Sequence, residues 1–595
     1  MTPVLDWLAR LAERVDRRLG WSRLPIAVAV PVLIGLRRRL RELNLHDTGR
    51  GSADHPDAGE TDVGDYRTRR TLYGEFNDLG DPLMGSVGSR FGRNVPVADT
   101  DPEPDDELLS PSPRLVSARL LARTEFQPAT TLNLLAAAWI QFEVHDWFSH
   151  GEVADTWDIA TDADDDWPQH PMRIKKTAPD PSPSPGPPTY VTDDTHWWDA
   201  SQLYGGTREY AHRLRTREHG KLLIDDLGLP PVDPDADLTG PAGNFWVGLA
   251  LLHSLFLREH NAICERLAAE YPTLDDQRLY DTARLITAAV IAKIHTIDWT
   301  PAIIAHPTTV FAMRANWFGL LGERFERRVG RITGSDLLQG IPGSDTDHHG
   351  VPYSLTEEFV AVYRMHPLIP DDVAFRAVAD DHQLAQWPMS KLLIDQVRQR
   401  LSETPMQDLF YSFGRAHPGA LTLHNYPNDM RALQRVDGPL DLAAADILRV
   451  RERGVPRYNE FRRLFRLAPA ATFEDLAGGD RALAAELRAV YGDVERVDLM
   501  IGLYAERKPE GFGFSDTAFR VFILMASRRL KSDRFLSRDF RAEVYTEVGM
   551  DWVRDADMRS VLLRHFPALA PALAGVANPF APWTSTAPAD RKASR

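Results

Sequence analysis

The stretch 133–150 reads NLLAAAWIQFEVHDWFSH, an apolar run that ends in a histidine, and it predicts a helix over Thr131–Phe148. Gln141 and His145 are four residues apart, so both side chains point to one face of that helix. Ala137 and Ala138 lie one to two turns earlier, where small residues let a flat ligand approach the backbone. A histidine beside an amide suits proton transfer with a bound ligand. For one isolated histidine, a buried side chain satisfied by hydrogen bonds is the commoner alternative.

A second stretch, Tyr363-Arg-Met-His366-Pro367, follows another apolar run. A helix is expected over Glu357–Met365, and Pro367 limits its continuation, so His366 is expected at the helix end on the apolar face. Two histidines placed in this way would put one imidazole on each face of a haem. Tyr363 lies one turn before His366, where its phenol is a candidate radical. The alternative for Tyr363 is a core tyrosine with a satisfied hydroxyl.

Composition limits the classes of function. The chain has 595 residues, of which 43% are hydrophobic and 26% charged, and a formal net charge of −16. That charge argues against sequence-independent binding of nucleic acid, which needs a basic surface. A single cysteine, Cys264, excludes an intrachain disulfide and a CxxCH haem attachment, and it fits a reducing, cytoplasmic location. Any haem is therefore expected to be held without thioether links.

The N-terminal segment leaves two alternatives open. Pro25–Leu36 (PIAVAVPVLIGL) is too short to span a membrane and is followed by Arg37-Arg38-Arg39. An apolar segment beside a basic cluster is typical of peripheral contact with a membrane surface. A helix packed on the body of the protein is the other interpretation. No small-residue cleavage site follows the apolar stretch, which argues against a signal peptide.

We expect one large, mainly α-helical domain, because helical periodicity dominates and strand alternation is scarce. The expected organisation is an N-terminal extension at 1–65, the domain at 66–575 and a flexible tail at 576–595. Three segments are expected to be loops: 47–65, 95–113 and 179–188. The other expected helices are Phe245–Tyr271, Leu279–Trp299 and Ser515–Leu530.

The segment Thr195-His-Trp197-Trp-Asp199-Ala-Ser201 places oxygen donors at every second residue. Hydroxyl, carboxylate and backbone carbonyl oxygens are the ligands that calcium takes. Asp146, next to His145, could complete the shell from the other face of its helix. Alone, this pattern could equally be a turn with local side-chain caps. The calcium interpretation rests on its pairing with His145-Asp146.

Taken together, these motifs resemble the animal-type haem peroxidase and cyclooxygenase superfamily, and most closely the fatty-acid α-dioxygenases of plants and bacteria. The likeness runs in order from about residue 70 to 565. Further segments carry it: LLHSLFLREHNAIC (251–264), ARLITAAVIAKIHTIDWT (283–300), MRANWFGLLG (313–322), HGVPYSLTEEFVAVYRMHPLIPD (349–371), VRERGVPRYNEFRR (450–463) and SDTAFRVFILMASRRLKSDRF (515–535).

The resemblance implies roles for the haem-site residues. His145 matches the distal histidine, with Gln141 as its amide partner, and His366 matches the proximal iron ligand. Tyr363 matches the tyrosine that is oxidised to a radical. The resemblance also implies a calcium site, whose matching residues are Asp146, Thr195, Trp197 (through its carbonyl), Asp199 and Ser201.

His295 and Thr300 match residues that hold the substrate carboxylate in α-dioxygenases, together with an arginine of the late helix. That arginine is Arg528 or Arg529. The apolar stripe of this helix consists of Phe519, Phe522, Ile523, Ala526 and Leu530. At about 100° per residue, Arg529 flanks the stripe and Arg528 faces away. We therefore expect Arg529 to bind the carboxylate, since a guanidinium suits bidentate recognition.

The chain departs from mammalian peroxidases at two places. The carboxylate and thioether residues that bond covalently to haem there are replaced by Ala242-Gly-Asn-Phe245-Trp246, so non-covalent haem b is expected. The asparagine partner of the proximal histidine is replaced by Asp446, which would hold the imidazole more strongly. Arg449, three residues later, matches a residue near the haem.

The function that the resemblance implies is a haem-dependent fatty-acid α-dioxygenase. Peroxide-activated haem would generate a Tyr363 radical, which takes hydrogen from C2 of a fatty acid, and dioxygen would add there to give a 2-hydroperoxy acid. Hydrogen peroxide would serve as activator. The alternatives are a haem peroxidase that oxidises small organic donors and a non-enzymatic haem carrier. The sequence does not give the preferred chain length or the oligomeric state.

Overall fold

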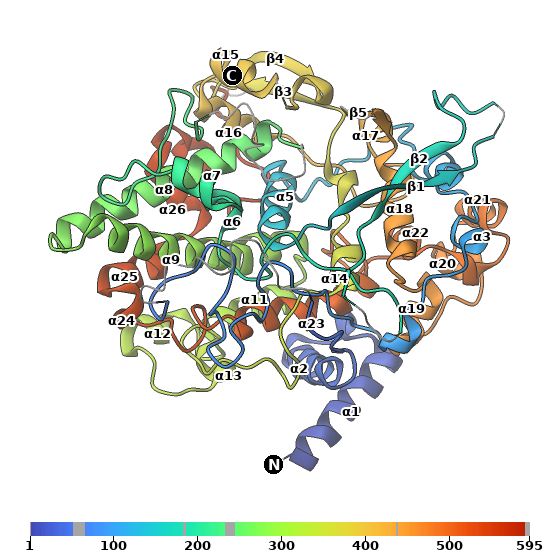
Figure 1. Cartoon of the computed structure of the whole chain (residues 1–595), viewed down its shortest axis with the longest axis horizontal. Coiled ribbons are helices and arrows are strands. Elements are labelled where there is room, and N and C mark those ends of the chain that lie inside the picture. Colours follow the sequence, from blue (N-terminus) through green and yellow to red (C-terminus); the bar gives the residue numbers. More distant parts are fainter. Residues whose placement is uncertain are drawn as a thin grey trace, which may run out of the picture.

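The computed structural model describes residues 2–51, 66–162, 164–182, 186–231, 244–394, 396–435 and 438–588. Helices are the main regular structure of this part of the chain, and the strands pair as antiparallel two-stranded hairpins, β1–β2, β3–β4 and β5–β6 (Figure 1). The expected mainly α-helical class is confirmed.

The longer helices are α1 Thr2–Leu19, α2 Ile26–Leu43, α5 Leu135–Trp147, α8 Val247–Glu270, α9 Asp276–Ile294, α11 Pro307–Phe318, α16 Met406–Arg415, α18 Leu442–Glu452, α21 Arg481–Tyr491 and α23 Asp516–Ser532. The short helices are α3 Asp105–Leu108, α4 Pro113–Val116, α6 Ser201–Tyr204, α7 Arg208–Arg213, α10 Thr300–Ile303, α12 Glu323–Val329, α13 Asp336–Gln339, α14 Glu357–Val362, α15 Gln396–Glu403, α17 Asn428–Arg431, α19 Tyr458–Leu464, α20 Phe473–Leu476, α22 Leu499–Ala505, α24 Ala542–Tyr545, α25 Glu547–Asp555, α26 Met558–His565 and α27 Ala570–Leu573. The strands are β1 Glu152–Ile159, β2 Met172–Thr177, β3 Asp372–Arg376, β4 Gln383–Pro388, β5 Leu433–Arg435 and β6 Gly438–Leu440. Single-turn 3₁₀ segments are η1 Trp21–Arg23, η2 Val97–Asp99, η5 His366–Leu368, η6 Met389–Lys391, η7 Val494–Arg496 and η8 Pro567–Leu569, and π-helical segments are η3 Ser117–Leu121 and η4 His295–Trp299.

The core lies around α8, which packs against both α5 and α9. Residues on all sides of α9 are buried, including the polar side chains of Thr287 and Lys293. A helix that is apolar on most faces belongs in the interior of a large domain. The site helices α14 and α23 also pack against each other, and α2 covers α23 and α11.

Five helices were expected at particular places, and all five form, with boundaries that differ by a few residues. The most informative difference is at the second motif, where α14 ends at Val362 instead of Met365. Tyr363 is the residue that follows the helix, and His366 begins the 3₁₀ turn η5. The expected helix over Glu357–Met365 with His366 at its end is therefore wrong in its last turn, because the chain leaves α-helical geometry at Tyr363.

The C-terminal segment is held on the body as far as Thr586, whose N–H and hydroxyl bind the hydroxyl of Tyr411 at 3.0 and 3.1 Å. Phe580 and Trp583 are buried, and Asn133, just before α5, donates to the backbone oxygens of Pro579 and Ala581 at 2.7 and 2.9 Å. Residues 576–586 of the segment predicted as a flexible tail thus pack on the body, and residues 589–595 lie outside the described part.

The segment Pro25–Leu36 belongs to α2, whose Val32, Leu33 and Leu36 are buried. The segment packs on the body through these residues, while Ile26 and Val28 at its start are exposed, and contact with a membrane stays a prediction. Parts of the expected loops at 52–65 and 183–185 lie outside the described residues. Within the described residues, no helix has the length and apolar character needed to cross a membrane.

Candidate active site

Asp446 organises the predicted proximal side. Its carboxylate lies 2.7 Å from Nδ1 of His366, accepts the hydroxyl of Tyr426 at 2.9 Å and pairs with Arg364. Burial would raise the pKa of Asp446, but its neighbours His366 and Arg364 hold it at about 2. The ionised carboxylate makes Nδ1 of His366 the donor, which leaves Nε2 with a lone pair for a metal. The His366 side chain is 35% exposed although its neighbours are buried, so it faces open space.

The predicted distal side lies on α5. The amide of Gln141 is fixed from two directions, because its Oε1 accepts from the indole of Trp246 at 2.7 Å and its Nε2 donates to the Asn244 carbonyl at 3.4 Å. His145 lies one turn further along the same helix. His253 of α8 is buried nearby, and burial followed by the charge of His145 lowers its pKa to about 3. His253 lies in a quoted motif, but nothing in the sequence distinguished it.

Tyr363 faces a second group of side chains, which line what we call the inner cavity. This cavity is lined by Trp198, His295, Thr296, Met313, Asn316, Phe359, Tyr363, Ala526, Arg529 and Leu530. The Tyr363 ring lies 4.4 Å from Phe359 and 5.7 Å from Trp147, centroid to centroid. Burial raises the pKa of the Tyr363 phenol, with Arg529 opposing the effect. The phenol is therefore neutral and keeps its hydrogen.

Arg529 is almost completely buried in the wall of the inner cavity. Its guanidinium carbon lies 3.8 Å from the ring centre of Trp147 and 4.3 Å from that of Trp198. Within the described part of the chain, its Nε and Nη2 atoms make no hydrogen bond. A buried cation with open donors is costly unless an anion satisfies it. Arg528 faces elsewhere and donates to the carbonyls of residues 351, 352 and 354.

His295 adds a neutral donor beside this cation. Burial, and then the charge of Arg529, lowers the pKa of His295 well below its usual value. The indole of Trp139 lies 3.2 Å from Nδ1. Indole can only donate, so Nδ1 must be the acceptor and the hydrogen lies on Nε2. His295 therefore keeps one N–H available for an acceptor.

Thr300 lies outside the lining of the inner cavity. Its hydroxyl donates to the carbonyl of His295 at 2.7 Å, across the π-helical turn η4. Its predicted direct contact with a carboxylate stays a prediction, and the observed bond indicates a role in holding the turn. Thr296 does line the cavity, although its hydroxyl donates to Ala292 at 2.8 Å.

The predicted calcium residues lie close together. Asp146 accepts from the backbone N–H of Ser201 at 2.6 Å and from its hydroxyl at 3.0 Å, and Asp199 accepts from the same N–H at 3.2 Å. Thr195 donates to Asp199 at 2.9 Å. Burial and mutual repulsion raise the pKa of Asp146, and burial raises that of Asp199. Arg284, 3.8 Å from Asp199, offsets part of that charge. Trp197 is buried in the same loop.

Arg449 lies one turn after Asp446 on α18 but is engaged in ion pairs, at 2.9 Å with Glu452 and 2.8 Å with Glu152. The sequence reasoning missed Arg364 and Tyr426, the other two partners of Asp446. Arg364 stands inside the Tyr363–His366 motif, where a basic residue beside a predicted ligand was the available signal. Tyr426 is brought in by the fold alone.

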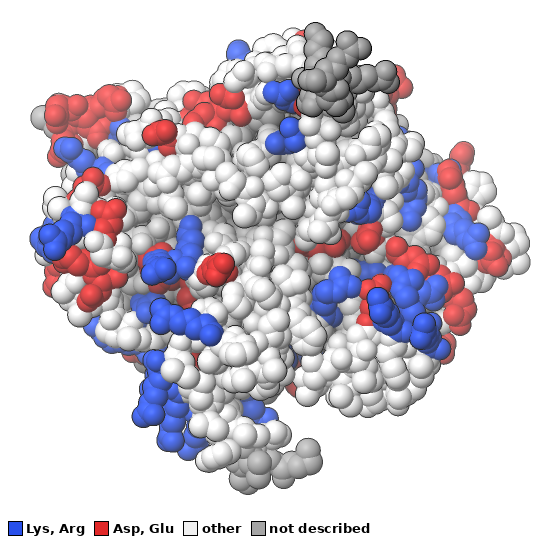
Figure 2. Space-filling model, turned by 180° about the vertical axis from the view of Figure 1, so that it is seen from behind, with Lys and Arg blue, Asp and Glu red and all other residues white. Residues whose placement is uncertain are grey.

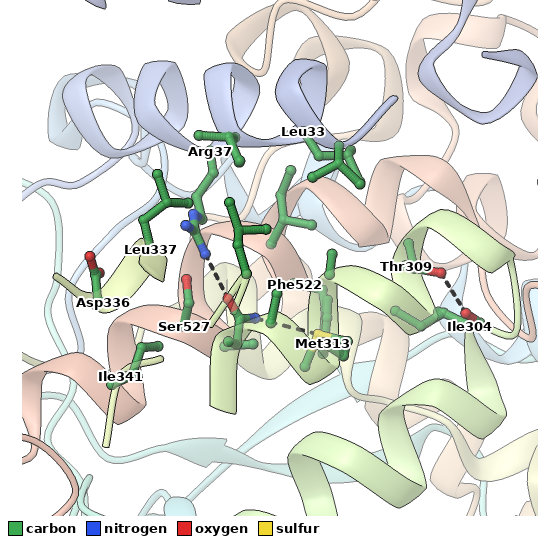
Figure 3. Close-up of a pocket in the computed structure, with 18 of the residues that line it drawn as sticks. Leu33, Arg37, Ile304, Thr309, Met313, Asp336, Leu337, Ile341, Phe522 and Ser527 are labelled. Atoms are coloured by element: carbon green, nitrogen blue, oxygen red, sulfur yellow. Dashed lines mark hydrogen bonds between the residues drawn. The ribbon is translucent and has the colours of Figure 1, made fainter. Parts of the chain in front are cut away.

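A larger apolar space, the outer cavity, lies under α2 (Figure 3). Leu33 and Arg37 reach into it from α2, while Phe522 and Ser527 reach into it from α23. Met313, Asn316 and Ala526 line both the outer and the inner cavity, so the two spaces adjoin. The apolar stripe predicted on the late helix supplies Phe519, Phe522, Ile523 and Ala526 to this lining.

Comparison with known proteins agrees with this geometry. A family model described as animal haem peroxidase matches residues 69–574. Alpha-dioxygenase PIOX of Oryza sativa subsp. japonica is 40% identical over 592 residues, which cover 96% of this chain and 94% of the relative. The chain belongs to the α-dioxygenases of the animal haem peroxidase family. Alpha-dioxygenase 2 of Arabidopsis thaliana is 39% identical, over 97% of this chain and 93% of the relative.

Solved α-dioxygenase structures share the fold. The Oryza sativa fatty acid α-dioxygenase superposes with a TM-score of 0.88 at 38% identity, over 98% of this chain and 97% of that one. The Arabidopsis thaliana enzyme gives a TM-score of 0.90 at 36% identity, over 100% and 95% of the two chains. The expected haem-peroxidase-like fold is thus confirmed for this α-dioxygenase.

Proposed function

We propose that this α-dioxygenase adds dioxygen to C2 of a fatty acid and yields a 2-hydroperoxy fatty acid. The observation that carries the proposal is the buried guanidinium of Arg529, which has open donors and lies in the same cavity as the phenol of Tyr363. A carboxylate is the anion that this site suits, through bidentate hydrogen bonds to the guanidinium. A variant of the Oryza sativa relative has been solved with palmitic acid, which supports a long-chain acid.

The position of the carboxylate explains why the reaction would fall on C2. Arg529 and the Nε2–H of His295 would hold the two carboxylate oxygens. The carbon next to the carboxylate then lies nearest to the anchor and, in this small cavity, beside Tyr363. The alkyl chain would extend past Ala526 into the outer cavity, whose lining is mainly apolar. Holding the acid in this way replaces a random encounter by a fixed geometry.

The residues around His366 fit a haem. Its Nδ1 is bound to Asp446, so its Nε2 would hold the iron, and the cysteine content of the chain leaves the haem without thioether links. Bound haem would supply the oxidising power after reaction with hydrogen peroxide. His145 would take a proton from one peroxide oxygen and return it to the other.

Tyr363 would carry the reaction to the substrate. As a phenoxyl radical it takes a hydrogen atom from C2, which restores tyrosine and leaves a carbon radical. Dioxygen adds to that carbon, and the resulting peroxyl group takes a hydrogen atom to become the hydroperoxide. If Tyr363 gives that atom, the phenoxyl radical is regenerated, and the net reaction consumes one acid and one dioxygen.

We also propose that a calcium ion joins Asp146 and Asp199 beside the distal helix. Two buried carboxylates that share one N–H donor repel each other, and a divalent cation with oxygen ligands would relieve that repulsion. Elemental analysis after dialysis should find about one calcium per chain, as one such loop would hold. The double variant Asp146→Asn/Asp199→Asn should lose it, and a calcium content unchanged in that variant would contradict the site.

Oxygen uptake with a series of fatty acids tests the main proposal. Haem-loaded protein should consume oxygen with long-chain acids, and mass spectrometry of the product should place the new oxygen at C2. The methyl esters of the same acids, which lack the carboxylate, should react poorly. Oxidation of small organic donors by peroxide without oxygen uptake on any fatty acid would favour a peroxidase instead.

A further inference from the structure

The first helix presents an apolar surface that the fold leaves uncovered. Leu5, Trp7, Leu8, Leu11 and Leu19 of α1 are all exposed, with Trp7 at 60% and Leu19 at 55%. At 100° per residue these positions fall within one arc of the helix. The residues that pack on the body, Ala9, Ala12 and Asp16, adjoin the Leu5 and Leu19 edge of this arc, so Trp7 and Leu11 face furthest from the body. Large exposed apolar side chains gathered on one helix face mark an interaction surface.

The acidic and basic residues of α1 have different surroundings. Its acidic residues hold the helix to the body, since Asp6 pairs with Arg38 at 2.6 Å, Glu13 with Arg39 at 3.6 Å and Asp16 with Arg520 at 2.8 Å. Its arginines, in contrast, are exposed and form no ion pair within the described part of the chain; they are Arg10, Arg14, Arg17 and Arg18. Arg10, Arg14 and Arg17 lie between the side of Asp6 and Glu13 and the apolar arc, and Arg18 falls beside Trp7 and Leu11.

This basic character is local. Residues 1–43 hold nine arginines and four acidic residues, whereas the whole chain has a net charge of −16. Figure 2 shows basic side chains gathered beside uncharged surface at the lower edge of the molecule, the end at which α1 and α2 lie in Figure 1. A basic rim around exposed apolar side chains is complementary to a surface of negative headgroups over acyl chains.

The outer cavity opens close to this surface. Leu320 and Leu337 line the cavity and are also 41% and 42% exposed, so they form part of its mouth. On α2, Ile26 and Val28 are exposed while Leu33 and Arg37 of the same helix line the cavity. Helix α2 therefore has exposed apolar residues at its start and residues of the outer-cavity wall in its second half.

We propose that α1 and the start of α2 dock on an anionic lipid bilayer and bring the mouth of the outer cavity to the membrane. The interaction is peripheral: α1 would lie in the headgroup region with Trp7 and Leu11 inserted and the arginines over the phosphates. The docking rests on the α1 surface itself, while the delivery of acyl chains from the bilayer rests on the proposed function.

Co-sedimentation of the full-length haem-loaded protein with vesicles tests the docking. Vesicles with 30% phosphatidylglycerol in phosphatidylcholine should carry the protein down, and pure phosphatidylcholine should carry down much less. Trp7→Glu/Leu11→Glu should abolish binding. Arg14→Glu/Arg17→Glu/Arg18→Glu should weaken it by more than tenfold, since each basic residue near such a surface contributes about fivefold.

Leu384→Glu is the matched control, because Leu384 is an exposed leucine on β4, at the opposite end of the view from α1 in Figure 1. It should bind vesicles as the wild type does. All variants should oxygenate dispersed fatty acid equally, which separates docking from the activity. Equal sedimentation of the wild type and Trp7→Glu/Leu11→Glu would overturn the proposal. So would light scattering that shows a dimer which the same variant dissolves, because a second copy would then cover the face.

Discussion

At the scale of single residues, the neighbours Arg528 and Arg529 point in directions about 100° apart on α23 and therefore have different roles. Arg528 binds three backbone carbonyls, whereas Arg529 lies against the rings of Trp147 and Trp198 in the wall of the inner cavity. The phase of the apolar stripe was enough to predict which of them would face the cavity. The position of Thr300 could not be predicted in the same way from the periodicity of α9. The π-helical turn at 295–299 changes the direction in which the residues after it point.

Replacing Arg529 by Ala should raise the KM for fatty acids about tenfold or more, since a hydrogen bond to a charged group contributes about 1.5–3 kcal/mol. The haem spectrum should stay unchanged. Arg528→Ala is the control, and it should lower the melting temperature while changing KM little, because its bonds are to backbone. A larger rise in KM for Arg528→Ala would show that the carboxylate binds elsewhere. Steady-state oxygen uptake measures both variants.

Tyr363→Phe should abolish oxygenation of fatty acids and keep the haem spectrum. Phenylalanine preserves the contacts with Phe359 and Trp147 and removes only the hydroxyl. Electron paramagnetic resonance after addition of peroxide should show a tyrosyl radical in the wild type that the variant lacks. Tyr545→Phe serves as a control for loss of a buried tyrosine hydroxyl away from the site, since that hydroxyl binds the Phe535 carbonyl at 2.8 Å. Formation of 2-hydroperoxy acid by Tyr363→Phe would exclude the radical role.

At the scale of elements, the sequence predicted which helices carry the site, because the apolar periodicity of α5, α8, α9 and α23 is long and regular. It failed at α14, a six-residue helix whose end is set by tertiary contacts. There the hydroxyl of Tyr504 binds the carbonyl of Arg364 and the side chain of Arg364 reaches Asp446. Neither partner is near in sequence, so no local pattern could predict that the chain turns after Val362.

The face of α23 that joins the two cavities gives a prediction for chain length. Ala526 lines both cavities, so a larger side chain there should close the passage between them. Ala526→Leu should reduce kcat/KM for sixteen-carbon acids by about tenfold or more, because placing the tail outside the cavity forfeits about 0.8 kcal/mol for each buried methylene. Eight-carbon acids should lose much less. Ala526→Ser keeps the size and should behave as the wild type, whereas an equal loss for both chain lengths in Ala526→Leu would contradict the path.

At the scale of the whole molecule, the sequence predicted one mainly helical domain. It did not predict how the C-terminal segment packs on that domain. The C-terminal segment is rich in Pro, Ala, Ser and Thr, a composition that favours mobility. Two aromatic side chains nevertheless anchor it. Phe580 lies 5.3 Å from the ring of Trp139 on α5, and Trp583 packs directly over Gly414, where an added Cβ would lie 2.1 Å from the indole. Contacts between residues so distant in sequence leave no periodic signal.

Trp583 should therefore contribute to stability far more than its place near the chain end suggests. Its ring is fully buried, its indole donates to the Pro579 carbonyl at 2.7 Å, and its own carbonyl accepts from Arg415 at 2.7 Å. Trp583→Ala should lower the free energy of unfolding by about 3–5 kcal/mol, the usual cost of removing a buried aromatic ring. Thr584→Ala, at the exposed next position, should change it little. Because the segment also binds Asn133 ahead of α5, Trp583→Ala should lose haem at a lower temperature than the wild type, as followed by the haem absorbance during heating. Equal melting of the two variants would mean that the segment adds nothing to the body it covers.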